Sequence, residues 1–325
     1  MRGTPRTPPI LLGQSRAIQE LRQKIRQVAP TSESVLIVGE NGTGKDLVAR
    51  ALHAASRRQE YPLVRVPCAA LDPAAMEAEI FGQGDPATGM PVRVGRIERA
   101  DRGTLLLDEV THLPPALQAK LRRVLDERSL DRPGFAGAIP VDLRVLSLLQ
   151  RSPSEEVAAG RLRQELYYRL AVVPIEIPPL RQRREDIPDL CAHFLQLVAE
   201  RLHCAPCVFA REALDLLARY DWPGNVRELE NLVTRATVLH AGERVTVAAV
   251  ADWLEVPLAA PGGDAAERLS AVERRHIEAT LERFQGHRAR TAQALGIGVR
   301  TLSAKLKEYG TQPAAGAVPS AHVAF

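Results

Sequence analysis

The chain has 325 residues, of which 45% are hydrophobic and 25% are charged. This composition is typical of a globular protein and excludes a disordered chain, and the length suggests about two domains. No apolar run approaches the ~18 residues that a membrane-spanning helix needs. The first ten residues, MRGTPRTPPI, lack the apolar stretch of a signal peptide. Four cysteines in a chain of this length do not make a disulfide framework, so we expect a protein of the reducing cytoplasm.

The first half of the chain alternates between helical and strand patterns. Apolar residues at helical spacing predict a helix through Ala17, Leu21, Ile25 and Val28. Short apolar runs predict strands at 35–38, 63–66, 104–107 and 143–149. Further helical patterns lie between these strands, with apolar positions at Leu47, Val48, Ala51 and Leu52, and at Leu117, Leu121 and Val124. The alternation predicts an α/β fold with a parallel sheet that helices cover on both faces.

Changes in composition divide the chain into segments. After a Pro- and Arg-rich tail (1–9), we expect the α/β unit at 10–180 and a helical subdomain without strands at 181–253. The stretch 254–267 is rich in Pro, Gly and Ala and is predicted to be a linker. A second helical module is expected at 268–310, followed by a tail of small residues at 311–325.

A glycine-rich loop, GENGTGKD, follows the first predicted strand and precedes a helix. Glycines let backbone N–H groups turn toward phosphate oxygens, and the N-terminus of a helix adds partial positive charge. The pattern therefore predicts a phosphate-binding loop, with a simple helix-capping turn as the alternative. The predicted phosphate-binding residues are Gly39, Glu40, Asn41, Gly42, Thr43, Gly44, Lys45 and Asp46.

Two adjacent carboxylates end the apolar run GTLLLDE about 60 residues further along the chain. Nucleoside triphosphatases need one acid for magnesium and one that orients or deprotonates the attacking water. Asp108 and Glu109 fit these two roles, with Asp108 as the predicted Mg²⁺ ligand. Many buried strands end in acids, so the prediction depends on the pairing with the upstream loop.

Several longer stretches resemble the AAA+ domain of bacterial enhancer-binding proteins, the activators of sigma-54 RNA polymerase. The resemblance covers residues from Ile10 to Trp253 and is carried by VLIVGENGTGKDLVARALH, GTLLLDEV, LRQELYYRLAVVPIEIPPLRQRREDIP and YDWPGNVRELENL. It implies an AAA+ P-loop core with a helical lid and an ATPase that forms a ring, usually a hexamer. By position, Arg163 and Arg169 match the arginine fingers offered to the neighbouring subunit, and Arg227 matches the sensor arginine of the lid.

The chain departs from this family in the loop that contacts sigma-54. The family reads Gly-Ala-Phe-Thr-Gly-Ala, whereas the aligned residues in this shortened segment are Asp85, Pro86, Ala87, Thr88, Gly89 and Met90. A loop that works by inserting an apolar tip loses contact area when Phe becomes Ala, at a cost of about 3 kcal/mol for a buried aromatic. We therefore expect weakened contact with sigma-54.

Two further departures concern hydrolysis. The family usually has Asn where this chain has Pro67, and proline offers no side-chain hydrogen bond to restrain Glu109. The strand that senses the nucleotide usually ends in Thr-Asn or Thr-His, whereas this one ends in Leu149-Gln150. Gln150 can still bond a γ-phosphate or water, with a longer reach. These changes predict secure ATP binding with weak or uncoupled hydrolysis.

Residues 268–310 resemble the Fis-type helix-turn-helix module of the same family. Ile277, Leu281 and Phe284 lie on one face of its first helix, and Val299, Leu302 and Leu306 are predicted to form the inner face of its recognition helix. Five Lys and Arg and no acid lie between positions 287 and 307, although the whole chain carries a net charge of only +4. This concentration predicts contact with DNA; a helical oligomerisation module is the alternative. The candidate DNA-binding residues are Arg288, Arg290, Arg300, Thr301, Ser303 and Lys305.

Together these observations predict a DNA-binding, ATP-binding transcription regulator of the sigma-54 activator type, with action independent of sigma-54 left open. Only nine residues precede Ile10, so we expect no receiver domain and no phosphorylation control within the chain. The alternatives are an ATP-driven remodeller and an accessory subunit in the ring of an intact relative. Cys204 and Cys207 suggest zinc, but a second Cys pair at finger spacing is missing, so an ordinary connection is preferred.

Overall fold

The computed structural model describes residues 11–70, 72, 75–85, 90–135, 137–254, 277, 280, 281, 283, 284, 286–295 and 297–308. The chain divides into two compact units, Met1–Val256 and Pro257–Phe325. Among the described helices, none combines the length and apolar character that crossing a membrane requires.

A five-stranded parallel sheet forms the centre of the first unit, with strand order β2-β5-β8-β1-β9. Its strands are β1 (Val35–Val38), β2 (Leu63–Pro67), β5 (Thr104–Asp108), β8 (Arg144–Leu149) and β9 (Val173–Glu176). The predicted α/β class and parallel sheet are confirmed. β9 is a strand that the apolar pattern did not predict, because it is short and contains Pro174 and the exposed Glu176.

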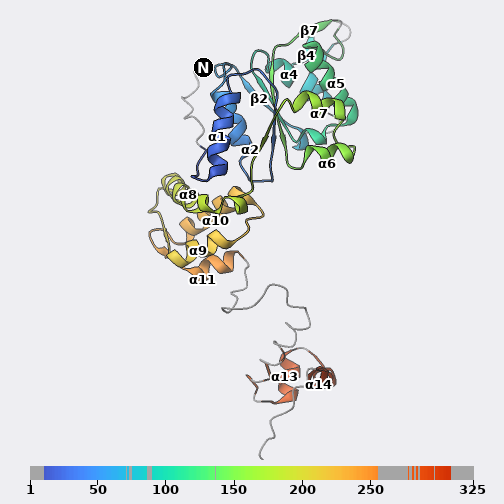
Figure 1. Ribbon diagram of the computed structural model, residues 1–325. Helices are drawn as coiled ribbons and strands as arrows, with labels where there is room; N and C mark the ends of the chain where they lie inside the picture. Colours follow the sequence, from blue (N-terminus) through green and yellow to red (C-terminus); the bar gives the residue numbers. More distant parts are fainter. Residues whose placement is uncertain are drawn as a thin grey trace, which may run out of the picture. The chain divides into compact units, whose positions relative to one another are not determined.

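Helices cover both faces of this sheet because successive strand residues point to opposite sides. The helices of the α/β core are α1 (Arg16–Val28), α2 (Lys45–Ala54), α3 (Met76–Phe81), α4 (Arg96–Arg99), α5 (Pro115–Glu127), α6 (Pro153–Ala158) and α7 (Gln164–Leu170). Val35 and Ile37 pack in one hydrophobic core with α1 and α2, whereas Leu36 and Leu105 pack in the other with α5 and α7. Figure 1 shows α1 and α2 on one side of the sheet and α5 and α7 on the other.

Two small antiparallel hairpins extend this core. One pairs β3 (Gln83–Gly84) with β4 (Pro91–Arg93), and the other pairs β6 (Ser129–Asp131) with β7 (Ala138–Pro140). The hairpins touch where the N–H of Gly84 donates to the carbonyl of Pro133 at 2.7 Å. A Cβ at Gly84 would lie 2.8 Å from the carbonyl oxygen of Gly134, so a side chain at this position would displace the second hairpin.

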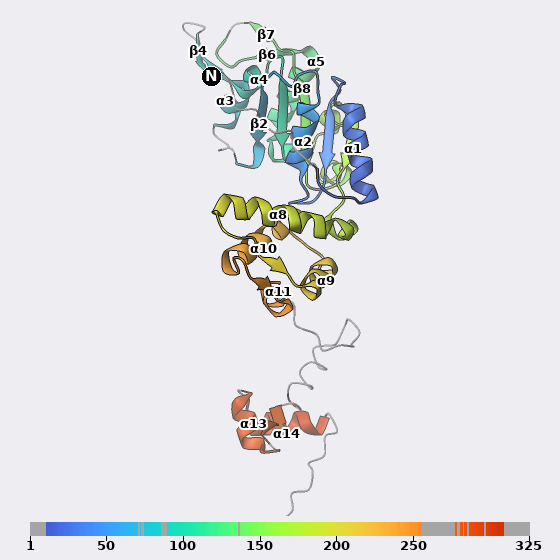
Figure 2. The same ribbon diagram turned by 90° about the vertical axis from the view of Figure 1, so that its left-hand side faces the viewer.

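The lid consists mainly of helices α8 (Ile187–Leu202), α9 (Arg211–Arg219), α10 (Asn225–Leu239) and α11 (Val247–Trp253). The short 3₁₀ turns η3 (Leu180–Gln182) and η4 (Arg184–Asp186) precede them, and Figure 2 shows α8 as the lid helix nearest the α/β core. The expectation of helices alone was wrong, because β10 (Val208–Phe209) pairs in parallel with β11 (Arg244–Val245). Strands of two residues are too short for an alternating pattern to reveal.

The lid is also tied to the start of the chain's described part. The carboxylate of Asp186 accepts hydrogen bonds from the N–H groups of Gln14 and Ser15, both at 2.7 Å, and from the Ser15 hydroxyl at 2.6 Å. Asp186 is fully buried, and a Cβ at Gly13 would lie 2.5 Å from its carboxyl carbon. Glycine is therefore required at position 13, whose φ of +124° is also one that other residues rarely adopt.

The second unit contains α13 (Arg288–Ala294) and α14 (Val299–Glu308). Its small core contains Ile277, Ala292, Leu302 and Leu306, with Leu281, Leu295 and Ile297 packed against them. The prediction that Val299 belongs to this core was wrong, since the residue is 48% exposed. As the first residue of α14, Val299 has no earlier helical turn over which to pack.

Candidate nucleotide-binding site and DNA-binding module

The glycine-rich loop lies between the end of β1 and the start of α2, as its sequence predicts. Gly42 and Gly44 have φ angles of +77° and +103°, a region in which glycine is strongly favoured. α2 begins at Lys45, so its N-terminal peptide dipoles contribute partial positive charge at the loop. The hydroxyl of Thr43 donates to the carbonyl of Glu40 at 2.8 Å and braces the loop from inside.

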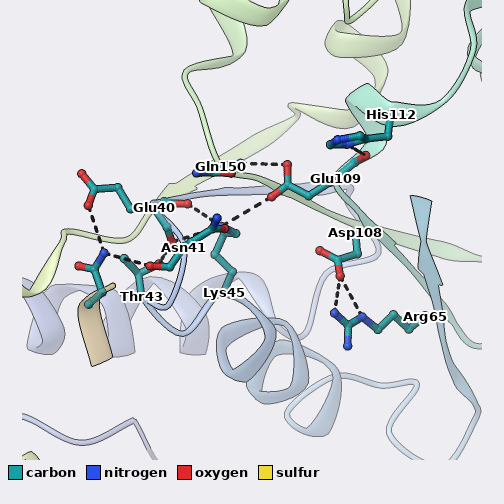
Figure 3. A network of polar contacts seen from close by, with 11 residues as sticks. Glu40, Asn41, Thr43, Lys45, Arg65, Asp108, Glu109, His112 and Gln150 are labelled. Carbon is teal, nitrogen blue, oxygen red and sulfur yellow. Dashed lines mark hydrogen bonds and ion pairs between the residues drawn. The ribbon is translucent and has the colours of Figure 1, made fainter. Parts of the chain in front are cut away.

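The ammonium group of Lys45 folds back on the loop that carries it (Figure 3). Its Nζ donates to the carbonyl oxygens of Gly39 at 2.6 Å and Glu40 at 3.3 Å, and lies 3.7 Å from Oε1 of Glu109. Burial lowers the pKa of Lys45, and the charges of Glu109 and Asp108 oppose this shift. Lys45 is therefore a partly desolvated cation. A phosphate that enters the site would interact with this positive charge and displace little water.

The two carboxylates at the end of β5 have separate partners. Oε2 of Glu109 accepts a hydrogen bond from the N–H of Gln150 at 3.3 Å, and burial raises the pKa of Glu109 while Lys45 opposes that shift. Glu109 has a φ of +57°, a strained conformation of a kind that persists mainly where the surrounding structure enforces it. Asp108 accepts hydrogen bonds on Oδ2 from the guanidinium of Arg65, with the Nε atom at 3.0 Å (Figure 3).

The lid closes on the phosphate loop through Glu40 and Asn225. The carboxylate of Glu40 accepts two hydrogen bonds from Arg181, at 2.8 and 2.5 Å, and one from Nδ2 of Asn225 at 3.1 Å. The hydrogen bond from Arg181 is the largest cause that lowers the pKa of Glu40 to about 2, and the hydrogen bond from Asn225 is the next largest. Asn225 also donates to the carbonyl of Asn41 at 3.0 Å and accepts from the N–H of Leu180 at 2.8 Å. We call Glu40, Arg181 and Asn225 the lid latch.

A buried arginine adds a second connection between lid and loop. Nη2 of Arg183 donates to the carbonyl of Thr43 at 3.0 Å. Gly42 fits tightly against the same part of the lid, since a Cβ there would lie 2.1 Å from the carbonyl oxygen of Gly224. The shape of the phosphate loop therefore depends on the position of the lid.

One pocket of about 500 Å³ brings these elements together. Its lining includes Lys45 and Asp46 of the loop, Asp108 and Glu109 of the sheet edge, and Arg227 of α10. Arg227 is exposed, and Asp46 forms an ion pair with Arg50 at 2.7 Å. The loop, the two acids and the lid arginine named from the sequence thus line one cavity. Basic and acidic groups arranged in this way can bind a polyphosphate together with a divalent cation.

The two arginines that match the family's fingers lie elsewhere. Arg163 precedes α7 and forms an ion pair with Glu165 at 3.6 Å. Arg169 donates to the carbonyl of Leu125 at 2.7 Å and lines a separate cavity of about 140 Å³ with Ser34. Neither arginine is among the described residues that line the nucleotide pocket.

The residues that depart from the family are also placed. Pro67 lies opposite Asp108 in the pairing of β2 with β5. Gln150 is exposed and holds Glu109 through its backbone N–H rather than through its side chain. At the predicted sigma-54 loop, the N–H of Asp85 donates to the carbonyl of Met90 at 2.9 Å and closes the base. Pro86, Ala87, Thr88 and Gly89 lie outside the described residues.

In the second unit, Arg288, Arg290 and Thr301 are exposed, and Ser303 and Lys305 are half-buried. The side chain of Arg300 lies outside the described set. Arg288 and Arg290 are on α13, whereas Thr301, Ser303 and Lys305 are on α14, so the module offers polar and basic groups from both helices. This distribution suits contact with phosphates from one helix and with a groove from the other.

Sequence reasoning missed several residues that contact the site from distant parts of the sequence. Arg65, Arg181, Arg183 and Asn225 each contact the phosphate loop or Asp108 across a sequence separation of more than 40 residues. Three of them lie inside the quoted stretches PPLRQRREDIP and WPGNVREL, which was the available signal. Among the described residues, no group of three or more His, Cys, Asp or Glu side chains is placed to hold a metal ion, and Cys204 and Cys207 are free thiols.

Three families match successive parts of the chain. Residues 11–176 match the sigma-54 interaction domain, residues 181–257 the AAA+ ATPase lid domain, and residues 268–309 the bacterial regulatory protein Fis family. The transcriptional regulatory protein ZraR of Escherichia coli K12 is 48% identical over 305 residues, which cover 91% of this chain and 68% of that protein. The regulatory protein AtoC of the same strain is 41% identical over 315 residues, covering 94% and 68%.

Solved structures agree with these matches. NtrX of Brucella abortus in complex with ATP is 37% identical, with a TM-score of 0.71 and coverage of 93% of this chain and 69% of that one. The complex of the same protein with ADP is 36% identical, with a TM-score of 0.72. The phosphate loop, the lid contacts and the basic C-terminal module agree with these matches. The chain therefore belongs to the sigma-54 activator family of transcriptional regulators, with an ATP-binding AAA+ core, a helical lid and a Fis-type DNA-binding module.

Proposed function

We propose that the chain hydrolyses ATP in the pocket between the phosphate loop, the end of β5 and the lid, and uses the energy to activate sigma-54 RNA polymerase at sites where its C-terminal module binds DNA. The observation that carries this proposal is the convergence of Lys45, Asp108 and Glu109 on one pocket that Arg227 of the lid also lines. Three parts of the chain that are distant in the sequence supply these groups, which a simple helix-capping turn would not require.

The donor set fits magnesium. Mg²⁺ prefers oxygen ligands and is commonly bound through one or two carboxylates together with substrate phosphates. Asp108 offers a carboxylate at the pocket wall, and Asp46 lines the same pocket where other phosphate loops have Ser or Thr. Asp108 would hold the Mg²⁺ ion, which when bound would neutralise charge on the phosphates.

The protein's own groups then divide the remaining work. Lys45 and the N-terminus of α2 would hold the phosphates, with Gly39, Glu40, Asn41, Gly42, Thr43 and Gly44 shaping the loop around them. Glu109, whose burial raises its pKa, would orient the attacking water and accept its proton. Arg227 would report the nucleotide to the lid. Its place on α10 puts it on the same helix as Asn225 of the lid latch.

Arg163 and Arg169 are proposed to act on the nucleotide of a neighbouring subunit in a ring, taken to be a hexamer. Ser34, which lines the cavity of Arg169, precedes β1, whereas Gly39 follows it. Five residues of extended chain separate these ends by about 16 Å, so Arg169 faces away from its own phosphate loop. This position supports the proposal that Arg169 acts on a phosphate of another subunit.

Mixing two inactive variants tests this arrangement. Lys45→Ala removes nucleotide binding but keeps the fingers, and Arg169→Ala removes a finger but keeps the phosphate loop. ATP turnover should be very low for each variant alone and should reappear when the two are mixed, because a Lys45→Ala subunit can supply its finger to an intact loop. Absence of any recovery across mixing ratios, with rings present by size-exclusion chromatography, would contradict action between subunits.

Contact with the polymerase is assigned to the loop from Asp85 to Met90. Its base is closed by the backbone hydrogen bond between these two residues, at the end of the β3–β4 hairpin. Because Ala87 stands where the family has Phe, we expect activation to be weaker than in a relative with the aromatic. Ala87→Phe should therefore increase transcript from a sigma-54 promoter without changing ATP turnover.

The presence of Ala87 where the family has Phe also favours one alternative, a regulator that acts without sigma-54. In that case Ala87→Phe leaves transcription unchanged, and specific DNA binding alone alters transcription by the ordinary polymerase even in Lys45→Ala. Strong ATP turnover without any DNA preference would instead indicate a remodeller. Co-purification with an intact relative would indicate an accessory ring subunit.

A further inference from the structure

Arg65 occupies a position that neither the phosphate loop nor the lid explains. It lies in the middle of β2, opposite Leu106 of β5, and its side chain reaches forward along the strands to Asp108. Nε and Nη2 both donate to the same carboxylate oxygen, Oδ2, and the guanidinium lines the nucleotide pocket. The pair is shown in Figure 3 beside Lys45 and Glu109.

Three of the acids that line this pocket are paired with cations. Glu109 is paired with Lys45, Asp46 with Arg50, and Asp108 with Arg65. The hydrogen bond to Asp108 is the main cause that raises the pKa of Arg65, and the charges of Asp108 and Asp46 add to it. The guanidinium is thus stabilised by both carboxylates that could hold a divalent cation.

This location creates a competition. Asp108 is the proposed Mg²⁺ ligand, and its side chain is only 19% exposed, so few of its oxygen lone pairs are open to the pocket. A guanidinium and a metal ion cannot both have full use of Oδ2. The positive charge of Arg65 also offsets the negative charge of Asp108. Without Arg65, the pocket would present the unbalanced charge of Asp108 to an incoming polyphosphate.

We propose that Arg65 is the resident cation of the metal site: it neutralises Asp108 so that nucleotide binds without metal, and it competes with Mg²⁺ for Oδ2 so that more Mg²⁺ is needed to complete the site. The inference rests on the nucleotide site proposed above. Arg65 acts through Asp108 and is a positioning residue.

The test uses the full chain and ADP, with affinity measured by isothermal titration calorimetry in EDTA and at a series of Mg²⁺ concentrations. Arg65→Gln should weaken ADP binding in EDTA by about two- to fivefold, the range that partly exposed ion pairs give. In the same variant, the Mg²⁺ concentration that gives half of the Mg²⁺-dependent change in ADP affinity should fall by a similar factor. The two changes have opposite directions, which a loss of folding cannot produce.

Two further variants sharpen the result. Arg65→Lys retains the charge without the paired donors and should give values between those of the wild type and Arg65→Gln. Arg16→Gln removes an arginine of equal charge whose partner, Glu20, is not among the residues that line the pocket, and it should leave the Mg²⁺ dependence within about twofold of the wild type. The proposal is overturned if Arg65→Gln weakens ADP binding equally with and without Mg²⁺, or leaves the Mg²⁺ dependence unchanged. Failure of the nucleotide site itself would show differently, as wild-type protein that binds no more ADP than Lys45→Ala.

Discussion

Replacement of Asn225 by alanine should loosen the lid from the phosphate loop. Asn225 is fully buried, and its side chain makes three hydrogen bonds, to Glu40, Asn41 and the N–H of Leu180. Glu40 and Asn41 retain access to solvent, but Leu180 is fully buried and its N–H would lose its side-chain partner. A buried donor left unpaired costs about 1–3 kcal/mol, and the two other bonds add about 0.5–1 kcal/mol together.

The backbone at this position adds a second penalty. Asn225 has a φ of +53°, and a left-handed conformation costs most residues about 1–2 kcal/mol, with Asn and Gly the usual exceptions. Asn225→Ala should therefore lower the free energy of unfolding by about 2.5–6 kcal/mol. Asn225→Gly removes the same hydrogen bonds without the conformational penalty and should cost about 1 kcal/mol less.

Tryptophan fluorescence during urea unfolding measures this effect in the lid itself. The chain has only two tryptophans, Trp222 and Trp253, and both belong to the lid core or pack against it. Asn231→Ala is the matched control, because Asn231 lies on the same helix and is exposed, so it should change stability by less than about 0.5 kcal/mol. ADP affinity should fall together with stability in Asn225→Ala. A loss below about 1 kcal/mol, or equal stability of the alanine and glycine variants, would refute this reasoning.

Three further outcomes test the phosphate loop, the lid latch and the C-terminal module. Gly42→Ala should abolish ADP binding measured by calorimetry, because its Cβ would lie 2.1 Å from the Gly224 carbonyl; near wild-type affinity would contradict this fit. Because Arg181 is the main cause that lowers the pKa of Glu40 from 4.5 to about 2, their ion pair stabilises the fold fully above pH 4.5 and loses its effect as the pH falls toward 2. Across that window, urea unfolding of the wild type should depend on pH more steeply than that of Glu40→Gln, and parallel curves would argue against the pair. Arg288→Ala should reduce the slope of log affinity for DNA against log salt by about 0.9, whereas an unchanged slope would exclude a phosphate contact there.

The central part of the fold and the site could be predicted because their signals are local. A strand, a glycine-rich loop, a lysine and a helix follow one another within about 20 residues, and β1 has the bounds that its apolar run predicts. Parallel strands end at one edge of the sheet, so the loop after β1 and the acids at the end of β5 were expected to meet. Their common pocket agrees with that geometry.

The remaining features depend on contacts that no local pattern contains. The partner of Asp108 is an arginine on a neighbouring strand, and a strand sequence does not tell which carboxylate an exposed arginine will reach. Glu40 and Asn225 are 185 residues apart and meet only because the lid folds back on the loop. Val299 fits the helical period of the buried face, but a first helical turn is buried only where another segment covers it.

The most direct test of the proposed function is transcription in vitro from a sigma-54 promoter. Purified protein, ATP and sigma-54 holoenzyme are combined, and full-length transcript is measured beside an intact relative as positive control. We expect transcript above the level without activator, below that of the relative, and absent with Lys45→Ala. No transcript from the wild type, while it binds DNA and hydrolyses ATP, would contradict activation of the sigma-54 polymerase by this chain.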